Sequence, residues 1–216
     1  MGIKQIKLEN MLPRVFVNET IPPSEVWRKN LCFNRGENYL IEAASGGGKS
    51  SLCAFIYGSR TDFEGELFFD DKNSSDISIS EWQTIRQTSI AYLPQELSLF
   101  PELSALDNIK LKNSLTGYAS DKQIEEWMEE IGIAFRADYP VGRMSIGQQQ
   151  RVAIIRAICQ PFDFILLDEP VSHLDEENNG IAATIIQREA SRQGASIIST
   201  SVGNPILLSS AKNLSL

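Results

Sequence analysis

The chain has 216 residues, of which 42% are hydrophobic, so it can bury one sizeable core without a structural metal or a disulfide. Its formal net charge of −8 argues against a nucleic-acid-binding surface, because such surfaces are usually basic. No run approaches the roughly 18 apolar residues of a membrane span, and the opening segment MGIKQIKLEN lacks the apolar core of a signal peptide. We therefore expect a soluble chain whose membrane role, if any, is exercised through a partner.

The cysteines are odd in number and far apart. Cys32, Cys53 and Cys159 each stand among apolar neighbours. This pattern predicts reduced, buried thiols in a cytosolic protein rather than a disulfide framework.

Short apolar runs alternate with helical patterns, which predicts a single α/β domain over residues 1–216. Near-continuous apolar runs are typical of strands that are covered on both faces. Five such runs occur, at Tyr39–Ala43, Glu66–Asp70, Ser89–Leu93, Phe164–Leu167 and Ala195–Thr200.

A helical segment is expected between the third and fourth runs. Its best helix begins at Ser120, which has capping-box spacing to Gln123, and ends at Gly132. Apolar residues inside it recur at helical spacing, and we interpret that stripe as core. The predicted organisation is a core of residues 1–95 and 160–216 with a helical subdomain at about 96–159.

A glycine-rich loop follows the first strand run and leads into an apolar helical pattern. Glycines let backbone N–H groups approach phosphates, and a helix N-terminus favours an anion. Lys49 would reach the β- and γ-phosphates, while Ser50 would offer its hydroxyl to Mg²⁺. Ala43 replaces the usual first glycine, which requires a negative φ there. The predicted phosphate-binding residues are Ser45, Gly46, Gly47, Gly48, Lys49, Ser50 and Ser51. The alternative is a flexible loop before a capped helix.

Two carboxylates follow the fourth strand run. Asp168 would stand at the mouth of the sheet as the Mg²⁺ carboxylate, and Glu169 beside it is the candidate general base. Pro170 then prevents the strand from continuing. A strand end with a charged turn is the alternative interpretation. The glycine-rich loop in the same chain favours the catalytic one.

The segment MSIGQQQRVAIIRAI, from Met144 to Ile158, resembles the signature motif of ABC ATPases. Its position before FILLDEP and SHLD matches that family, and the resemblance runs from Ile6 to about Leu208. It implies a P-loop NTPase fold with a mainly parallel sheet, an antiparallel β portion near the N-terminus and a helical insertion. It also identifies Gln95 as the Q-loop glutamine, a catalytic and metal-contacting residue. Phe16 is similar to the adenine-stacking aromatic residue, although it could equally be a core residue of a strand.

The signature segment also has a local rationale. Ser145 and Gln148 have capping-box spacing, so a helix should begin near Ser145 and offer its positive end to a phosphate. In the family that phosphate belongs to ATP held by the other subunit, which implies contacts from Ser145, Gly147, Gln148 and the D-loop residue Asp175. Ile146 replaces a glycine, so we expect an ordinary backbone conformation there.

A second departure from the family affects the chemistry. Ser201 stands where the family carries a histidine that contacts the γ-phosphate. Loss of one positioned group near a transition state costs about 3–4 kcal/mol, or roughly 10²–10³ in rate. We therefore predict slow ATP hydrolysis, with Ser201 as a candidate replacement.

His173, the one histidine of the chain, has three possible interpretations. It could form interface or capping hydrogen bonds, face solvent without a role, or contact a γ-phosphate or water across a dimer. A metal site that combines it with Asp168 and Asp175 is disfavoured, because no second histidine or cysteine lies nearby.

The resemblance implies a cytoplasmic ATP-binding and ATP-hydrolysing subunit of an ABC transporter. It would use ATP and Mg²⁺, form a homodimer and lie on the inner face of the membrane through a separate permease, without nucleic acid. GQQQRVAIIRAI is similar to the branch that serves lipoprotein-extracting, macrolide-exporting and cell-division permeases. The alternatives are a regulatory ATP switch with little turnover and a soluble ABC ATPase outside transport.

Overall fold

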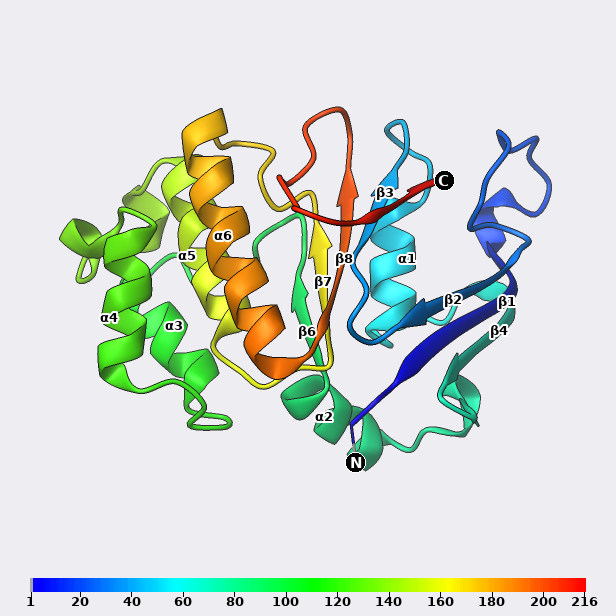
Figure 1. Cartoon of the computed structure of the whole chain (residues 1–216), viewed down its shortest axis with the longest axis horizontal. Helices are drawn as coiled ribbons and strands as arrows, with labels where there is room; N and C mark the ends of the chain where they lie inside the picture. The colour runs from blue at the N-terminus through cyan, green and yellow to red at the C-terminus, as the bar shows by residue number, and fades with distance from the viewer. Residues whose placement is uncertain (1) are drawn as a thin grey trace.

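Two β-sheets form the framework of the chain, and the computed structural model describes residues 2–216 of it. The larger sheet has five strands, and every neighbouring pair in it is parallel. Its carboxyl ends therefore lie at one edge, at the top of Figure 1. In spatial order the strands are β6 (Ile90–Leu93), β7 (Phe164–Asp168), β8 (Ser196–Ser201), β3 (Tyr39–Glu42) and β9 (Lys212–Ser215).

The smaller sheet is antiparallel and lies near the N-terminus. Its order is β2 (Asn30–Asn34), β1 (Gln5–Pro13), β4 (Phe63–Phe69) and β5 (Lys72–Asn73). Residues 6 and 8 of β1 are fully buried, and the residues between and beside them are more exposed, so one face of the strand packs on the core.

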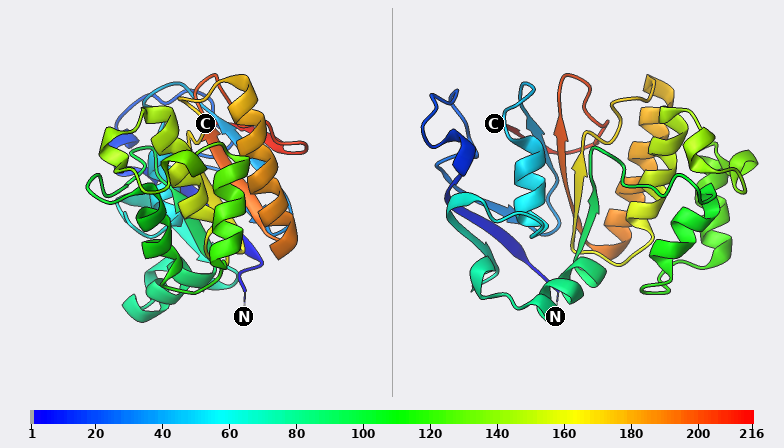
Figure 2. Two further views of the ribbon diagram at one scale, coloured as in Figure 1. Left: turned by 90° about the vertical axis from the view of Figure 1, so that its left-hand side faces the viewer. Right: turned by 180° about the vertical axis from the view of Figure 1, so that it is seen from behind.

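Six α-helices complete the fold of residues 2–216. They are α1 (Lys49–Ile56), α2 (Ile79–Thr88), α3 (Ala105–Asn113), α4 (Asp121–Glu130), α5 (Ile146–Ile158) and α6 (Glu176–Gln193). Short 3₁₀ turns occur at Arg14–Phe16, Ser74–Asp76, Ala134–Arg136 and Val141–Arg143. Helix α1 lies between the two sheets, whereas α3, α4 and α5 gather at the opposite end of the molecule, as Figure 1 and the right-hand view of Figure 2 show. None of the helices in residues 2–216 is both long and apolar enough to cross a membrane.

Two apolar clusters hold these layers together. One joins α1 to both sheets through side chains such as Ile6, Phe55 and Phe164. The other joins α5 and α6 to the opposite face of the parallel sheet, and it includes Trp127 of α4. Full burial of one such large side chain contributes about 1.5–3 kcal/mol. The glycine-rich loop that ends at α1 is therefore anchored on two packed sheets.

Three local expectations need correction. The run Glu66–Asp70 belongs to a strand that starts earlier, at Phe63, and ends before Asp70, whose φ of 53° turns the chain. Phe16 lies in a 3₁₀ turn and is not a strand core residue. Cys32 is only partly buried, because β2 is the edge strand of its sheet, whereas Cys53 and Cys159 are buried as predicted.

Candidate active site

The loop between β3 and α1 is held in a shape that requires glycine. Gly48, the N-cap of α1, has a φ of 94°, and a Cβ there would lie 3.0 Å from ring atoms of both Phe16 and Trp27. Trp27 donates a hydrogen bond from Nε1 to the carbonyl oxygen of Gly47, at 3.0 Å. The φ angle of Ala43 is not in the left-handed region, as predicted for a residue that replaces the usual first glycine. The loop thus presents the first N–H groups of α1 toward an anion.

Lys49 begins α1 and is 5% exposed. Its ammonium donates to the carbonyl oxygens of Ala43 at 3.2 Å and Ala44 at 3.0 Å, and it lies 3.8 Å from a carboxylate oxygen of Glu169. The side chain therefore curls back over its own loop. This arrangement holds a cation next to the N-terminus of α1, where phosphate charge would be stabilised.

Asp168, the last residue of β7, is almost completely buried. One of its oxygens, Oδ1, accepts a 2.7 Å hydrogen bond from the Thr200 hydroxyl, while Oδ2 has no hydrogen-bond partner among the described residues. The Asp168 charge helps to raise the pKa of the Cys53 thiol, after the larger effect of burial, so the carboxylate lies beside α1. An unpartnered buried oxygen at this place fits a cation.

A second oxygen pair lies at the start of α1. The Ser50 hydroxyl donates to Oε1 of Gln95 at 3.2 Å. Hydroxyl, amide and carboxylate oxygens are ligands that Mg²⁺ accepts. The donor set of Ser50, Gln95 and Asp168 therefore fits Mg²⁺ by its chemistry.

Glu169 has a φ of 52°, which is unusual for a residue with a large side chain. Its backbone N–H donates to the Thr200 carbonyl at 3.2 Å, and its carbonyl accepts from Nε2 of Gln150 at 3.1 Å. The left-handed conformation separates its carboxylate, which faces Lys49, from that of Asp168, which is buried against Thr200.

A pocket of about 450 Å³ unites these segments. Most of the residues predicted to bind phosphate or to act in catalysis line this pocket. The wall consists of Val15, Phe16, Ser45, Gly46, Gly48, Lys49, Ser50, Ser51, Arg60, Gln95 and Glu169. The glycine-rich loop, two cationic side chains, an aromatic ring and a carboxylate thus line one pocket.

The signature residues lie outside this pocket. The structure confirms the predicted helix start: Ser145 caps α5 and forms a capping box with Gln148, with hydrogen bonds of 3.3 and 3.0 Å. Ile146 has ordinary helical backbone, as expected, and half of its surface is exposed. Gly147 packs closely against the segment after β7, because a Cβ at Gly147 would be 2.9 Å from the His173 carbonyl oxygen.

Asp175 also lies outside the pocket, where it caps α6. Its Oδ1 accepts from the Asn178 N–H at 2.8 Å, and this bond lowers the pKa of Asp175.

His173 is exposed, with Nδ1 3.0 Å from the Ser172 hydroxyl oxygen. Ser201 ends β8 and is buried, but it is not a wall residue, and its hydroxyl has no hydrogen-bond partner among residues 2–216.

Two positioning residues were not predicted. Thr200 orients Asp168, and its neighbours in sequence give no signal of this role. Gln150 is 1% exposed; its amide donates to the Glu169 carbonyl and Ser172, and its Oε1 accepts from the His173 N–H at 3.0 Å. Gln150 stands four residues before Ile154, on the apolar stripe of α5. A polar residue within an apolar stripe is the sequence feature that could have indicated its positioning role.

Comparison with known proteins gives a consistent result. A family profile described as "ABC transporter" matches residues 27–172. The macrolide export ATP-binding/permease protein MacB of Bartonella henselae is 31% identical over 172 residues, covering 78% of this chain and 26% of that protein. The lipoprotein-releasing system ATP-binding protein LolD of Saccharophagus degradans is 32% identical over 152 residues, covering 69% of this chain and 67% of that protein. The chain thus spans about a quarter of the MacB relative.

Solved structures agree in fold. The dimeric structure of the ATP-binding cassette MJ0796, in a post-hydrolysis state bound to ADP and Pi, matches with a TM-score of 0.75 and 26% identity, over 92% of this chain and 88% of that chain. The MJ0796 sequence, from Methanocaldococcus jannaschii, is 29% identical over 200 residues, which cover 89% of this chain and 85% of that protein. The predicted fold class is confirmed.

Proposed function

Because the chain belongs to the ABC transporter family, we propose that it is the ATP-binding and ATP-hydrolysing subunit of a transporter. The observation that carries this proposal is the single pocket that joins the phosphate loop to Glu169, next to the buried Asp168. A phosphate cradle with a carboxylate at its far side is what phosphoryl transfer to water requires.

We assign the roles within the pocket from their contacts. The first N–H groups of α1 and Lys49 bind the triphosphate, and the Phe16 ring faces the base. Ser50, Gln95 and Asp168 would hold Mg²⁺, which neutralises developing charge on the phosphates when it is bound. Glu169 orients the attacking water and accepts its proton. Its carboxylate is 17% exposed and lines the pocket, so it can reach a water there.

The proposal is tested by MgATP binding and turnover of purified variants. Lys49→Ala should weaken ATP binding, because the buried ammonium is lost, and Glu169→Gln should keep ATP binding while losing turnover. Glu64→Gln, an exposed carboxylate on β4, is the matched control and should match the wild type. Wild-type turnover equal to that of Glu169→Gln would contradict the proposal.

For the partner we propose a membrane permease that docks between the ATP-binding core and a helical subdomain at about 96–159. A groove of about 260 Å³ lies there, and it is lined by side chains that include Tyr57, Tyr92, Lys112 and Arg156. Burial lowers the pKa of both Lys112 and Arg156, and neither forms a salt bridge within residues 2–216. A permease segment carrying a carboxylate would supply the missing counter-charge.

The docking proposal is tested by co-expressing this chain with a candidate membrane permease. Arg156→Glu should reduce co-purification of that permease without changing ATP affinity, and Arg188→Glu, outside the groove, is the control. Equal recovery with both variants would exclude the groove as the docking site. Docking there would hold the chain at the inner face of the membrane, as in a transporter of the lipoprotein-releasing or macrolide-exporting type.

One observation favours a second candidate, a regulatory ATP switch with little turnover. Ser201, at the position of the family's γ-phosphate histidine, is buried and outside the pocket wall. ATP turnover measured with and without the permease separates the two candidates, because a switch stays silent in both conditions and a transporter subunit is stimulated by its partner.

A further inference from the structure

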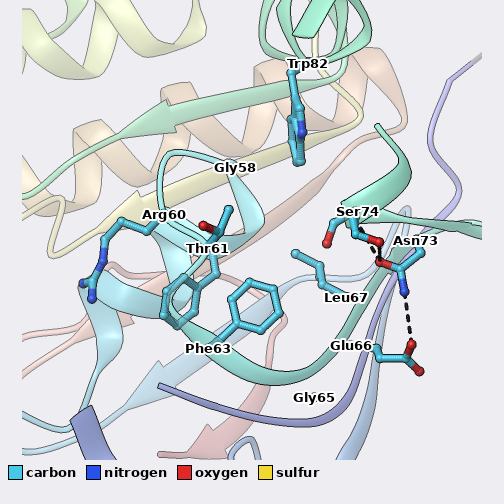
Figure 3. A pocket seen from close by; sticks show the side chains of 12 residues that line it. Gly58, Arg60, Thr61, Phe63, Gly65, Glu66, Leu67, Asn73, Ser74 and Trp82 are labelled. Carbon is cyan, nitrogen blue, oxygen red and sulfur yellow. Dashed lines mark hydrogen bonds between the residues drawn. The ribbon is translucent and has the colours of Figure 1, made fainter. Parts of the chain in front are cut away.

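Arg60 lies in the loop after α1, at the boundary of two pockets. Its stem borders a cavity of about 280 Å³ behind α1, next to Thr61 and Phe63. Figure 3 shows that its guanidinium points away from the centre of this cavity, opposite to Trp82 and Asn73. The same residue is part of the wall of the active-site pocket. Its charge is therefore available on the nucleotide side of the loop.

The guanidinium is fixed before any ligand binds. Its Nη1 donates to the Ser51 hydroxyl at 2.9 Å, its Nε donates to Oδ1 of Asp62 at 2.9 Å, and its Nη2 donates to the other Asp62 oxygen. It also lies 5.3 Å from the Phe55 ring centroid. These bonds use three of the roughly five N–H groups of an arginine, so two remain for a further acceptor. The side chain is 43% exposed, so a ligand can reach them.

We propose that Arg60 is a nucleotide-contacting residue that binds the α-phosphate, an assignment that rests on the proposed ATP-binding function. The wall of the pocket contains two cations, Lys49 and Arg60. In phosphate loops of this kind the lysine reaches the β- and γ-phosphates, which leaves the α-phosphate without a side-chain cation. Arg60 is hydrogen-bonded to Ser51, the residue directly after the proposed Mg²⁺ ligand Ser50. It therefore adds a second cation to the phosphate-binding site, beside the first turn of α1.

The assignment predicts equal effects on two nucleotides, because ATP and ADP share the α-phosphate. Arg60→Gln should raise the dissociation constants for ATP and ADP by the same factor, about tenfold for one partly exposed charged hydrogen bond. Arg60→Lys should give an intermediate value, because it keeps the charge and loses the planar fork. Arg188→Gln is the matched control: Arg188 is 47% exposed, pairs with Glu130 and lies outside the pocket.

Fluorescent ATP and ADP analogues, titrated into each folded variant, distinguish the possible failures. If the wild type binds neither nucleotide, the proposed function is wrong. If the wild type binds both and Arg60→Gln binds both within twofold of it, Arg60 has only a structural role and the inference is wrong. A loss confined to ATP would place the contact at the γ-phosphate and would also overturn the assignment. Should Arg60→Gln fail to fold, Arg60→Lys decides between the same outcomes.

Discussion

Two adjacent carboxylates have different surroundings because of one backbone angle. Glu169 has a φ of 52°, and this turn leaves Asp168 buried against Thr200 while the Glu169 carboxylate lies 3.8 Å from Lys49. A left-handed residue of this type costs about 1–3 kcal/mol and persists only where its surroundings fix it. Here the fixing bonds come from Thr200 and Gln150. The strain thus maintains two separate carboxylate environments.

Ser201 supports a prediction at the same scale. Its hydroxyl is buried without a partner in the described structure, so Ser201→Ala should change the free energy of unfolding by less than about 0.5 kcal/mol and leave ATP turnover unchanged. Thr200→Val is the matched comparison. It removes a 2.7 Å hydrogen bond to Asp168 and should cost about 1–3 kcal/mol and lower turnover. Chemical denaturation and turnover assays measure both effects, and a tenfold loss of turnover in Ser201→Ala would contradict this prediction.

The placement of residues that depends on local spacing was predictable from the sequence. Gly48, Lys49 and Ser50 adjoin one another in a strand, loop and helix pattern, and this order alone brings them to a helix N-terminus. Thr200 and Arg60 could not be predicted in this way. Their partners Asp168 and Ser51 are contacts of the folded chain, and no periodicity connects either pair.

At the scale of elements, apolar content decided what could be predicted. The buried strands of the parallel sheet have near-continuous apolar runs, and four of the five were located. Strand β9 was missed because KNLS is polar and lies at the sheet edge, and β5 has only two residues. Strands β1 and β2 have one solvated face, so their apolar residues are interrupted by polar ones.

Gln150 connects α5 to the segment after β7, and this connection predicts the effect of a substitution. Gln150→Leu should lower turnover more than ATP affinity, because the Glu169 carbonyl, the Ser172 hydroxyl and the His173 N–H lose their partner while the glycine-rich loop keeps its contacts. Stability should fall by roughly 1–3 kcal/mol for each buried polar group left without a partner. Gln149→Leu, which loses one bond to the Met144 carbonyl, is the control on the same helix. Equal losses of kcat and affinity would contradict a positioning role for Gln150.

Strand β9 is joined to the core by a group that titrates in acid. Lys212 of β9 and Tyr39 of β3 bond to Glu37 and lower its pKa from 4.5 to about 2, with the Lys212 hydrogen bond as the largest cause. Because the folded-state pKa is depressed, the stabilisation is present above about pH 4.5 and is lost as pH falls toward 2. The difference in melting temperature between wild type and Glu37→Gln should therefore be constant near neutral pH and shrink below about pH 4.5.

The control for this effect is a double variant. In a Lys212→Met background the largest cause of the shift is gone, so Glu37→Gln should have a smaller effect at every pH. A melting-temperature difference that stays unchanged from pH 7 to pH 3 would show that the carboxylate does not stabilise β9.

At the scale of the whole molecule, the signature residues and the active-site pocket are separate in one chain. We predict that ATP assembles a dimer in which a second chain presents Ser145 and Gly147 to the nucleotide. Ile146→Glu should prevent it in a Glu169→Gln background, because a carboxylate at the exposed start of α5 would face a phosphate of the partner. The helix itself tolerates an acid in its first turn.

The matched control is Ile79→Glu, which places the same charge at the exposed first position of α2, behind another serine capping box. Light scattering with and without MgATP measures the mass of each variant. Dimer formation by Ile146→Glu to the same extent as by Ile79→Glu would exclude the start of α5 from the interface.

The tryptophan at the phosphate loop gives this protein a built-in optical probe. Trp27 is nearly buried, its indole donates to Gly47, and its ring adjoins Gly48. The chain has two other tryptophans, Trp82 and Trp127, in α2 and α4. Replacing both with phenylalanine would leave Trp27 as the one tryptophan, and its emission, excited at wavelengths that the five tyrosines do not absorb, would report on the loop around Gly47. Nucleotide entry could then be followed in real time by stopped-flow emission, without a dye on either the protein or the ligand.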